Sequence, residues 1–83
     1  MTIWKFPLPT SGRFKLRLPV GAKPLAVQEQ FGEPCMWALC DPTAPKEDRA
    51  FRIYGTGHPV DSEASYVGTF QQNGGWHLFM ECQ

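Results

Sequence analysis

Two Gly-Thr turns carry the residues of this chain whose types best suit ligand binding. Tyr54 leads into Gly55-Thr56-Gly57-His58-Pro59, and Tyr66-Val67 leads into Gly68-Thr69-Phe70. If the strands that end in these turns are neighbours, exposed backbone, two hydroxyls, an imidazole and two phenols meet at one place. Such a combination recognises a ligand through hydrogen bonds and stacking. The sequence therefore predicts one binding site formed by both turns.

The Gly55-Thr56-Gly57 turn is a candidate anion site. Glycine permits the close approach and the positive φ that a nest of backbone N–H groups around a phosphate or carboxylate requires. The motif lacks the lysine and the following helix of a P-loop, so a simple turn between strands is the alternative. Arg52 shares a strand face with Tyr54 and adds a guanidinium that suits a phosphate or nucleotide, unless it pairs with an acid across strands.

The predicted site binds a ligand without chemistry, cofactor or metal. The residue types of a hydrolytic triad occur at His58, Asp61, Ser62 and Ser65, but they lie within eight positions of one loop and no oxyanion-type glycine flanks either serine. Cys35 and Cys40 are five apart, so in a strand they point to opposite faces and cannot chelate one ion together. The predicted ligand-binding residues are Arg52, Tyr54, Gly55, Thr56, Gly57, His58, Tyr66 and Thr69.

Composition bounds the partners of this single 83-residue domain, 1–83. Eight Lys and Arg balance eight Asp and Glu, so no overall field attracts nucleic acid or an anionic membrane. Within residues 1–30, however, five bases face one acid, and within residues 31–83 three bases face seven acids. Arg13, Lys15 and Arg17 form a basic stripe without interleaved aromatics, which favours a solvated strand face over a single-strand-binding surface.

The cysteines and the hydropathy pattern suggest a compartment. Three cysteines cannot all pair, and their spacing matches no disulfide framework or zinc knuckle. The chain has no signal-peptide pattern and no run of 18 apolar residues. We expect reduced thiols and a soluble, cytoplasmic protein.

The elements that must position the site are short strands. Eight glycines and eight prolines interrupt the chain too often for ordinary helices. Alternating apolar residues predict strands at 3–8, 13–20, 25–31, 35–39, 51–54, 65–71 and 76–82. Hairpin turns are expected at 32–34 and at the Asn-Gly pair of 72–75, and a mobile polar loop at 41–48. The fold class is all-β, a small antiparallel barrel or sandwich of about seven short strands with little or no helix.

Open sheet edges predict self-association. A sheet this small leaves unpaired edges unless its barrel closes, and Pro7 and Pro9 confine the first strand to an edge. That strand has apolar side chains on both faces, and Trp4 near the terminus is a candidate oligomer contact. We expect a homo-oligomer.

Several stretches together resemble one family. They are F-R-I-Y-G-T-G-H-P (Phe51 to Pro59), Y-V-G-T-F (Tyr66 to Phe70), G-G-W-H-L-F-M-E (Gly74 to Glu81) and the segment from Leu18 to Asp41. In them the chain is similar to a family of small, about 80-residue proteins of tailed bacteriophages whose function is unknown. The resemblance implies a phage protein acting in the bacterial cytoplasm, and lone phage domains of this size are commonly anti-defence factors.

Three functions remain open on the sequence. The first is capture of an anionic, nucleotide-type immune signal at the Gly-Thr turns. The second is an inhibitor that binds and masks a host defence protein, in the manner of an anti-CRISPR, for which small size and exposed strand edges are suited. The third is a minor virion or structural protein.

Overall fold

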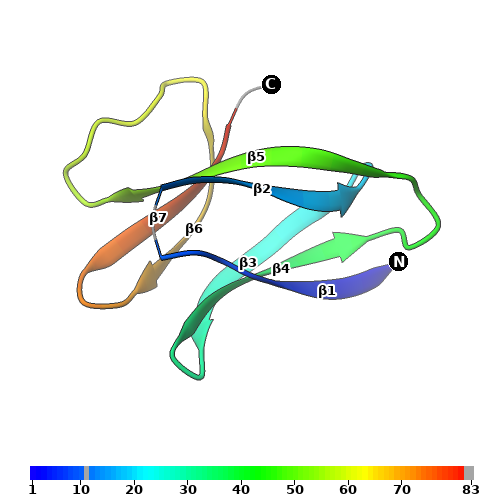
Figure 1. Ribbon diagram of the computed structural model, residues 1–83, viewed down its shortest axis with the longest axis horizontal. Helices are drawn as coiled ribbons and strands as arrows, with labels where there is room; N and C mark the ends of the chain where they lie inside the picture. Colours follow the sequence, from blue (N-terminus) through cyan, green and yellow to red (C-terminus); the bar gives the residue numbers. More distant parts are fainter. Residues whose placement is uncertain (11, 82–83) are drawn as a thin grey trace.

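Seven strands form the part of the chain that the computed structural model describes, residues 1–10 and 12–81 (Figure 1). They are β1 (Thr2–Pro7), β2 (Gly12–Pro19), β3 (Lys23–Gln30), β4 (Glu33–Cys40), β5 (Lys46–Gly55), β6 (Ser65–Gln71) and β7 (Gly75–Met80). The described residues include no helix, and therefore none that could cross a membrane. The all-β prediction is confirmed. Cys82, expected at the end of the last strand, lies outside the described residues.

The strands form two antiparallel sheets that pack on each other as a sandwich. One sheet has three strands in the order β1-β4-β3, and the other has four in the order β2-β5-β7-β6. β1 is an edge strand, as its prolines predicted. The expectation that β5 and β6 pair directly is wrong, because β7 lies between them and pairs with both.

Alternation along the strands explains how the sheets face each other. In β2, Leu18 is fully buried while Arg13 and Lys15 are exposed. In β4, Met36, Ala38 and Cys40 are completely buried, whereas Trp37 and Leu39 on the opposite face are only half-buried. β4 is the central strand of its sheet, but only one of its faces is fully covered.

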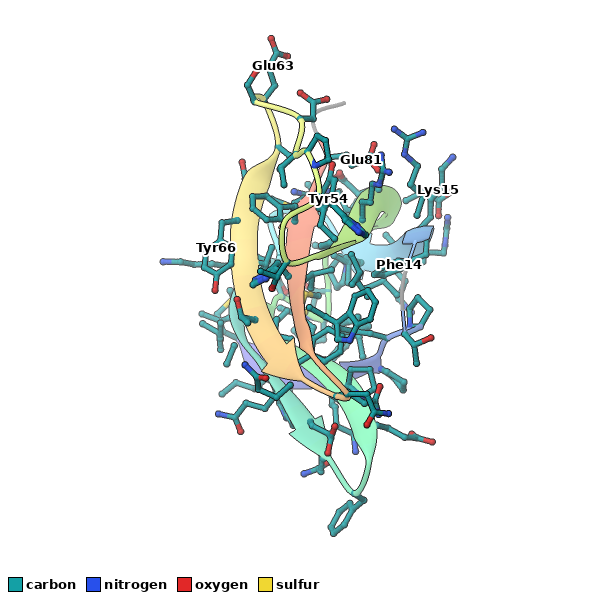
Figure 2. The ribbon with its side chains drawn as sticks, turned by 90° about the vertical axis from the view of Figure 1, so that its left-hand side faces the viewer. Phe14, Lys15, Tyr54, Glu63, Tyr66 and Glu81 are labelled. Carbon is teal, nitrogen blue, oxygen red and sulfur yellow. The ribbon has the colours of Figure 1, made fainter. Side chains whose placement is uncertain are left out.

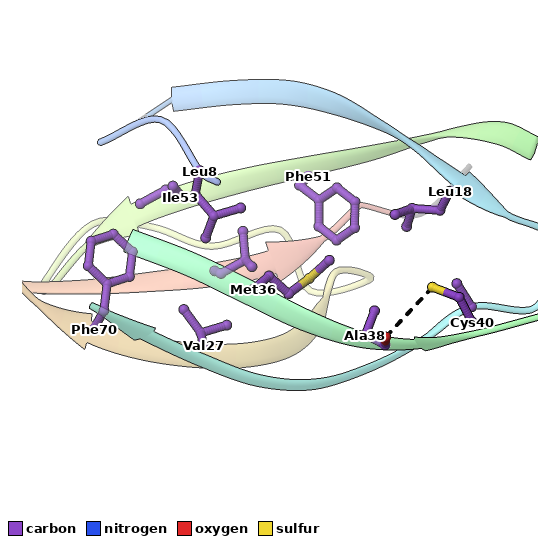
Figure 3. Packing of buried hydrophobic residues seen from close by; sticks show 11 residues of the cluster. Leu8, Leu18, Val27, Met36, Ala38, Cys40, Phe51, Ile53 and Phe70 are labelled. Carbon is purple, nitrogen blue, oxygen red and sulfur yellow. Dashed lines mark hydrogen bonds between the residues drawn. The ribbon is translucent and has the colours of Figure 1, made fainter. Parts of the chain in front are cut away.

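The core lies between the sheets (Figure 3). Leu18, Met36, Phe51 and Leu78 have no exposed surface, and each such side chain stabilises the fold by roughly 1.5–3 kcal/mol through burial. The rings of Phe14 and Phe51 stack with centroids 5.6 Å apart. Trp4 also packs against this cluster, with the Lys46 ammonium 5.5 Å from its ring centroid. Its side chain is therefore partly buried against the core.

The turns agree only in part with the expectations. Asn73 (φ 54°) and Gly74 (φ 129°) form the β6–β7 turn, as the Asn-Gly pair predicted. The β3–β4 turn lies one or two residues earlier than expected, at Phe31 and Gly32, and Glu33 and Pro34 already belong to β4. The expected 41–48 loop is shorter, because β5 begins at Lys46.

β3 and β6 lie side by side although they belong to different sheets (Figure 3). Gly68 of β6 faces Val27 so closely that a Cβ on the glycine would lie 2.8 Å from the Val27 Cβ. The absence of a side chain at position 68 therefore lets the two sheets approach at this edge.

Candidate functional site

The outer face of the four-stranded sheet, the face turned away from the three-stranded sheet, holds most of the predicted site residues. Phe51 and Ile53 point into the core, so the residues between and after them, Arg52 and Tyr54, point outward. The Arg52 guanidinium carbon lies 4.8 Å from the centroid of the Tyr54 ring, a cation–π distance. The predicted neighbourhood of Arg52 and Tyr54 is confirmed.

Phe79 of β7 joins the two tyrosines. Its ring centroid lies 5.4 Å from that of Tyr54 and 5.5 Å from that of Tyr66, both in edge-type geometry. Tyr54 is buried, whereas Tyr66 is 60% exposed. Figure 2 shows Tyr66, Tyr54 and Lys15 in that order across the sheet. Tyr66 and its neighbour Phe79 thus offer an accessible aromatic surface.

The expectation that Gly68-Thr69 forms a turn is wrong, because both residues lie inside β6 and pair with β7. A chain of hydrogen bonds nevertheless links this segment to the Gly55-Thr56-Gly57 turn. The Tyr66 hydroxyl lies 2.7 Å from Thr69 Oγ1, which lies 2.9 Å from His77 Nδ1. On the other side of the ring, His77 Nε2 lies 2.8 Å from Thr56 Oγ1. The two Gly-Thr segments therefore do lie close together, but a histidine of the intervening strand connects them.

His77 replaces His58 as the imidazole at the centre of the site. His58 folds over its own turn: its N–H donates to the Gly55 carbonyl at 3.1 Å, and a Cβ on Gly55 would lie 3.1 Å from His58 Cε1. His77 was missed because only strand order reveals that it lies between β5 and β6. The sequence signal was the alternation that places His77 on the same face of its strand as Phe79.

The Gly55-Thr56-Gly57 turn is not an open anion nest. The Thr56 N–H donates to the Gly75 carbonyl at 3.3 Å, and the His58 N–H donates within the turn. Gly57 does adopt a positive φ of 89°, which explains its residue type as a requirement of the turn. The backbone donors expected to hold an anion are thus largely occupied by the protein itself.

Positive charge gathers instead where β2 meets β5. Arg13 and Arg52 are direct cross-strand partners, and Lys15 lies opposite Ala50. Arg13 Nε pairs with Glu81 Oε1 at 3.1 Å, but neither Arg52 nor Lys15 belongs to an ion pair of the described residues. Within the described residues, therefore, no acid on a neighbouring strand pairs with Arg52.

A hollow of 460 Å³ lies beside this cluster, and we call it the Ala50 hollow. It is lined by Arg13, Phe14, Lys15, Ala50, Phe51 and Glu81. Phe14, Lys15 and Glu81 mark its position in Figure 2. None of the predicted ligand-binding residues lines this hollow, which belongs to the basic stripe of β2. The sequence had favoured a plain solvated face there.

Comparison with known proteins places the chain in a family. A family model described as Domain of unknown function (DUF7352) matches residues 1–83. The chain belongs to this family. No curated protein and no solved structure matches it significantly. For this DUF7352 domain, the chemistry of the outer face is therefore what bears on function.

The cysteines of the DUF7352 domain that the structure describes are free and buried. Burial raises the pKa of the Cys40 thiol, and its Sγ donates to the Ala38 carbonyl at 3.6 Å. A protonated, enclosed thiol is a poor nucleophile and a poor metal ligand. Within residues 1–10 and 12–81, no three His, Cys, Asp or Glu side chains gather as a metal site.

Proposed function

We propose that this protein binds an anionic, nucleotide-type ligand on the outer face of its four-stranded sheet, without chemistry. One cross-sheet row supports the proposal: Arg13 is opposite Arg52, Arg52 is opposite Phe79, and Phe79 is opposite Tyr66. Two cations are followed by two aromatic rings on one face. This order matches a molecule with a phosphate at one end and a base at the other.

The two arginines at one end of the row favour an anionic ligand. Like charges directly opposite on neighbouring strands destabilise a sheet. Glu81 offsets the charge of Arg13, while Arg52 rests on the Tyr54 ring, which leaves its outer N–H groups for a ligand. A phosphate between the two guanidiniums would convert the repulsion into charge-assisted hydrogen bonds.

The aromatic end of the row suits a base. Neighbouring strands are about 4.8 Å apart, so the row from β2 to β6 spans roughly 14 Å, which is long enough for both parts of a nucleotide. Stacking on exposed aromatic side chains is tolerant of base identity. The hydroxyls and imidazole of Thr69, His77 and Thr56 lie beside the rings and provide polar partners for a sugar or base edge.

The biological setting of the proposal comes from the resemblance to small phage proteins. In the cytoplasm of an infected bacterium, a protein that binds a signalling nucleotide and leaves it intact would lower its free concentration. We propose such sequestration of an immune signal as the role of the site, with no cofactor and no membrane or nucleic-acid partner.

A second candidate is masking of a host defence protein. The outer face of the three-stranded sheet supports it, since Ile3 is 59% and Leu25 48% exposed beside the half-buried Trp37 and Leu39. Exposed apolar patches commonly mark protein interfaces. This function uses the opposite side of the molecule, so variants of the Arg52 row leave it unchanged.

Calorimetric titration tests the nucleotide proposal. The probes are adenosine, inorganic phosphate, ADP and a cyclic diadenylate, each added to the wild-type protein. We expect the two nucleotides to bind more tightly than adenosine or phosphate, because only they engage both ends of the row. Heat denaturation of the complex followed by mass spectrometry should recover the nucleotide unchanged. Absence of binding to every probe contradicts the proposal, and recovery of a converted nucleotide contradicts binding without chemistry.

A further inference from the structure

The β3–β4 hairpin ends in an aromatic side chain that contributes nothing to the core. Phe31 is 97% exposed and has a φ of 52°, and Gly32 follows with a φ of 81°. Positive φ at both central residues favours Asn-Gly, and a bulky residue in this region is strained. The other tight hairpin of the chain uses the favoured pair, Asn73-Gly74. Folding alone therefore does not explain a phenylalanine at position 31.

The surroundings of Phe31 are acidic and held in place. We call residues 29–33 the Phe31 tip. Glu29 and Glu33 are exposed and take part in none of the ion pairs seen among the described residues. At the base of the tip the Lys5 ammonium donates to Gln30 Oε1 at 2.8 Å. The Gln72 amide donates to the Gly32 carbonyl at 2.7 Å, so the ring is presented on an anchored turn.

The Ala50 hollow has the complementary chemistry. Its lining includes two cations, Arg13 and Lys15, and Lys15 has no ion-pair partner among the described residues. Ala50 lies opposite Lys15 of β2. On its other side, the Glu81 N–H donates to the Ala50 carbonyl at 2.9 Å. The small alanine leaves room between the long side chains, whose methylene stems can cover an aromatic ring.

We propose that the Phe31 tip of one copy docks into the Ala50 hollow of a second copy. The ring enters between the stems of Arg13 and Lys15. The carboxylates of Glu29 and Glu33 meet the Lys15 ammonium and the Arg13 guanidinium, of which Arg13 also pairs with Glu81 of the same hollow. An aromatic anchor in a pocket with opposite charges around it is the usual composition of an interface centre. The β3–β4 turn lies at one end of the molecule, far from the labelled Phe14, Lys15 and Glu81 of the hollow (Figure 2), so one copy cannot satisfy its own hollow.

This geometry makes the contact head-to-tail. Each copy has one tip and one hollow, and such a heterologous contact builds rings if the rotation closes and open chains if it does not. The contact shares Arg13 with the proposed nucleotide site but needs neither Arg52 nor the aromatic end of the row. Association measured without nucleotide tests it separately from ligand binding.

Sedimentation velocity over a concentration series tests the proposal on the full chain. We expect the wild type to assemble beyond a dimer as concentration rises, and less so at high salt because the rim is charged. Phe31→Asn keeps the turn, since asparagine tolerates this φ, and should weaken association by roughly thirtyfold or more as an anchor residue is lost. Lys15→Glu should also weaken association. A wild type that stays monomeric throughout, or unchanged association of Phe31→Asn, overturns the proposal.

A mixture of the two variants tests the head-to-tail arrangement. Phe31→Asn retains a working hollow and Lys15→Glu retains a working tip, so the mixture should form one-to-one dimers and nothing larger. A chain with both Lys15→Glu and Glu33→Lys should recover association relative to either single variant. If the mixture remains monomeric while the wild type assembles, the head-to-tail contact is wrong.

Discussion

Arg13 and Arg52 are direct partners across β2 and β5 on the outer face of the four-stranded sheet. Each has a different local neighbour: Arg13 pairs with Glu81, and Arg52 lies over Tyr54. Since like charges opposite each other weaken a sheet, this pair is not explained by stability. An anion bound between the two guanidiniums, as we propose for the phosphate of the ligand, would account for the pair.

Arg52→Ala separates binding from stability. We expect nucleotide affinity to fall about ten- to hundredfold, since a charge-assisted hydrogen bond is lost. The free energy of unfolding should change by no more than ~0.5 kcal/mol or should rise, because a like-charge contact disappears. Calorimetric titration and urea unfolding of the same protein measure both quantities.

Arg17→Ala is the matched control for Arg52→Ala. Arg17 lies on the same face and pairs with Asp48 at 3.4 Å, with both side chains largely exposed, so its pair contributes little to stability. Its removal lowers the net charge equally but leaves the row of Arg13, Arg52, Phe79 and Tyr66 intact. If Arg52→Ala and Arg17→Ala lost the same nucleotide affinity, the loss would reflect the overall positive charge of this face rather than a specific binding site at Arg52.

Tyr66 tests the aromatic end of the row. Tyr66→Ala should weaken nucleotide binding by about 1–3 kcal/mol, the usual value of a base stacked on an aromatic ring. Tyr66→Phe keeps the ring and loses only the hydroxyl contact with Thr69, so its affinity should stay close to that of the wild type. If phosphate alone binds as tightly as ADP and Tyr66→Ala changes neither affinity, no base stacks there.

His77→Ala should destabilise the fold more than His58→Ala. The His77 ring bonds Thr56 and Thr69 at once, and each such bond contributes roughly 0.5–1.5 kcal/mol. Its loss should therefore cost ~1–3 kcal/mol in urea unfolding. His58 is exposed on its turn, and its replacement should stay within ~0.5 kcal/mol. If His58→Ala lowered the free energy of unfolding more than His77→Ala, the hydrogen-bonded link from Thr56 through His77 to Thr69 would be contradicted.

Strand positions were largely predictable from the sequence because alternation and turn residues are local signals. The pattern of Phe14, Leu16 and Leu18 against the basic stripe defined β2, and Asn73-Gly74 defined a hairpin. The strain at Phe31 was not predictable, because an apolar residue beside glycine looked like the end of a strand. The start of β5 was missed because Lys46 to Asp48 are polar on an exposed edge.

The site was only partly predictable because its key contacts depend on strand order. The alternation of side chains along a strand correctly placed Arg52 and Tyr54 on the same face, next to each other. The contributions of Phe79 and His77 follow from β7 lying between β5 and β6, and those of Arg13 and Lys15 follow from β2 pairing with β5. These neighbours are distant in sequence, and no local pattern encodes which strands pair.

The turn at Asp41 should depend on pH through Thr43. The Thr43 hydroxyl donates to Asp41 Oδ1 at 2.7 Å and the Thr43 N–H donates at 2.9 Å, which lowers the pKa of the Asp41 carboxyl. Because the folded pKa is below the unfolded one, this contribution to stability is present above the unfolded pKa and is lost as pH falls through the folded pKa. Thr43→Val should raise the Asp41 pKa in an NMR titration, and an unchanged pKa would contradict the role of the hydroxyl.

Gly68 and Val27 test how the two sheets approach each other. A Cβ at position 68 would lie 2.8 Å from both Cβ and Cγ2 of Val27, so Gly68→Ala should destabilise the fold by about 1–3 kcal/mol through overpacking. Val27→Ala alone removes a buried side chain and should cost roughly 2 kcal/mol. In the double variant the alanine at 68 enters the space that Val27 leaves, so its cost should be smaller than the sum of the two single costs by at least ~1 kcal/mol. Urea unfolding of all four proteins gives this difference, and strictly additive costs would show that β3 and β6 do not meet through these two residues.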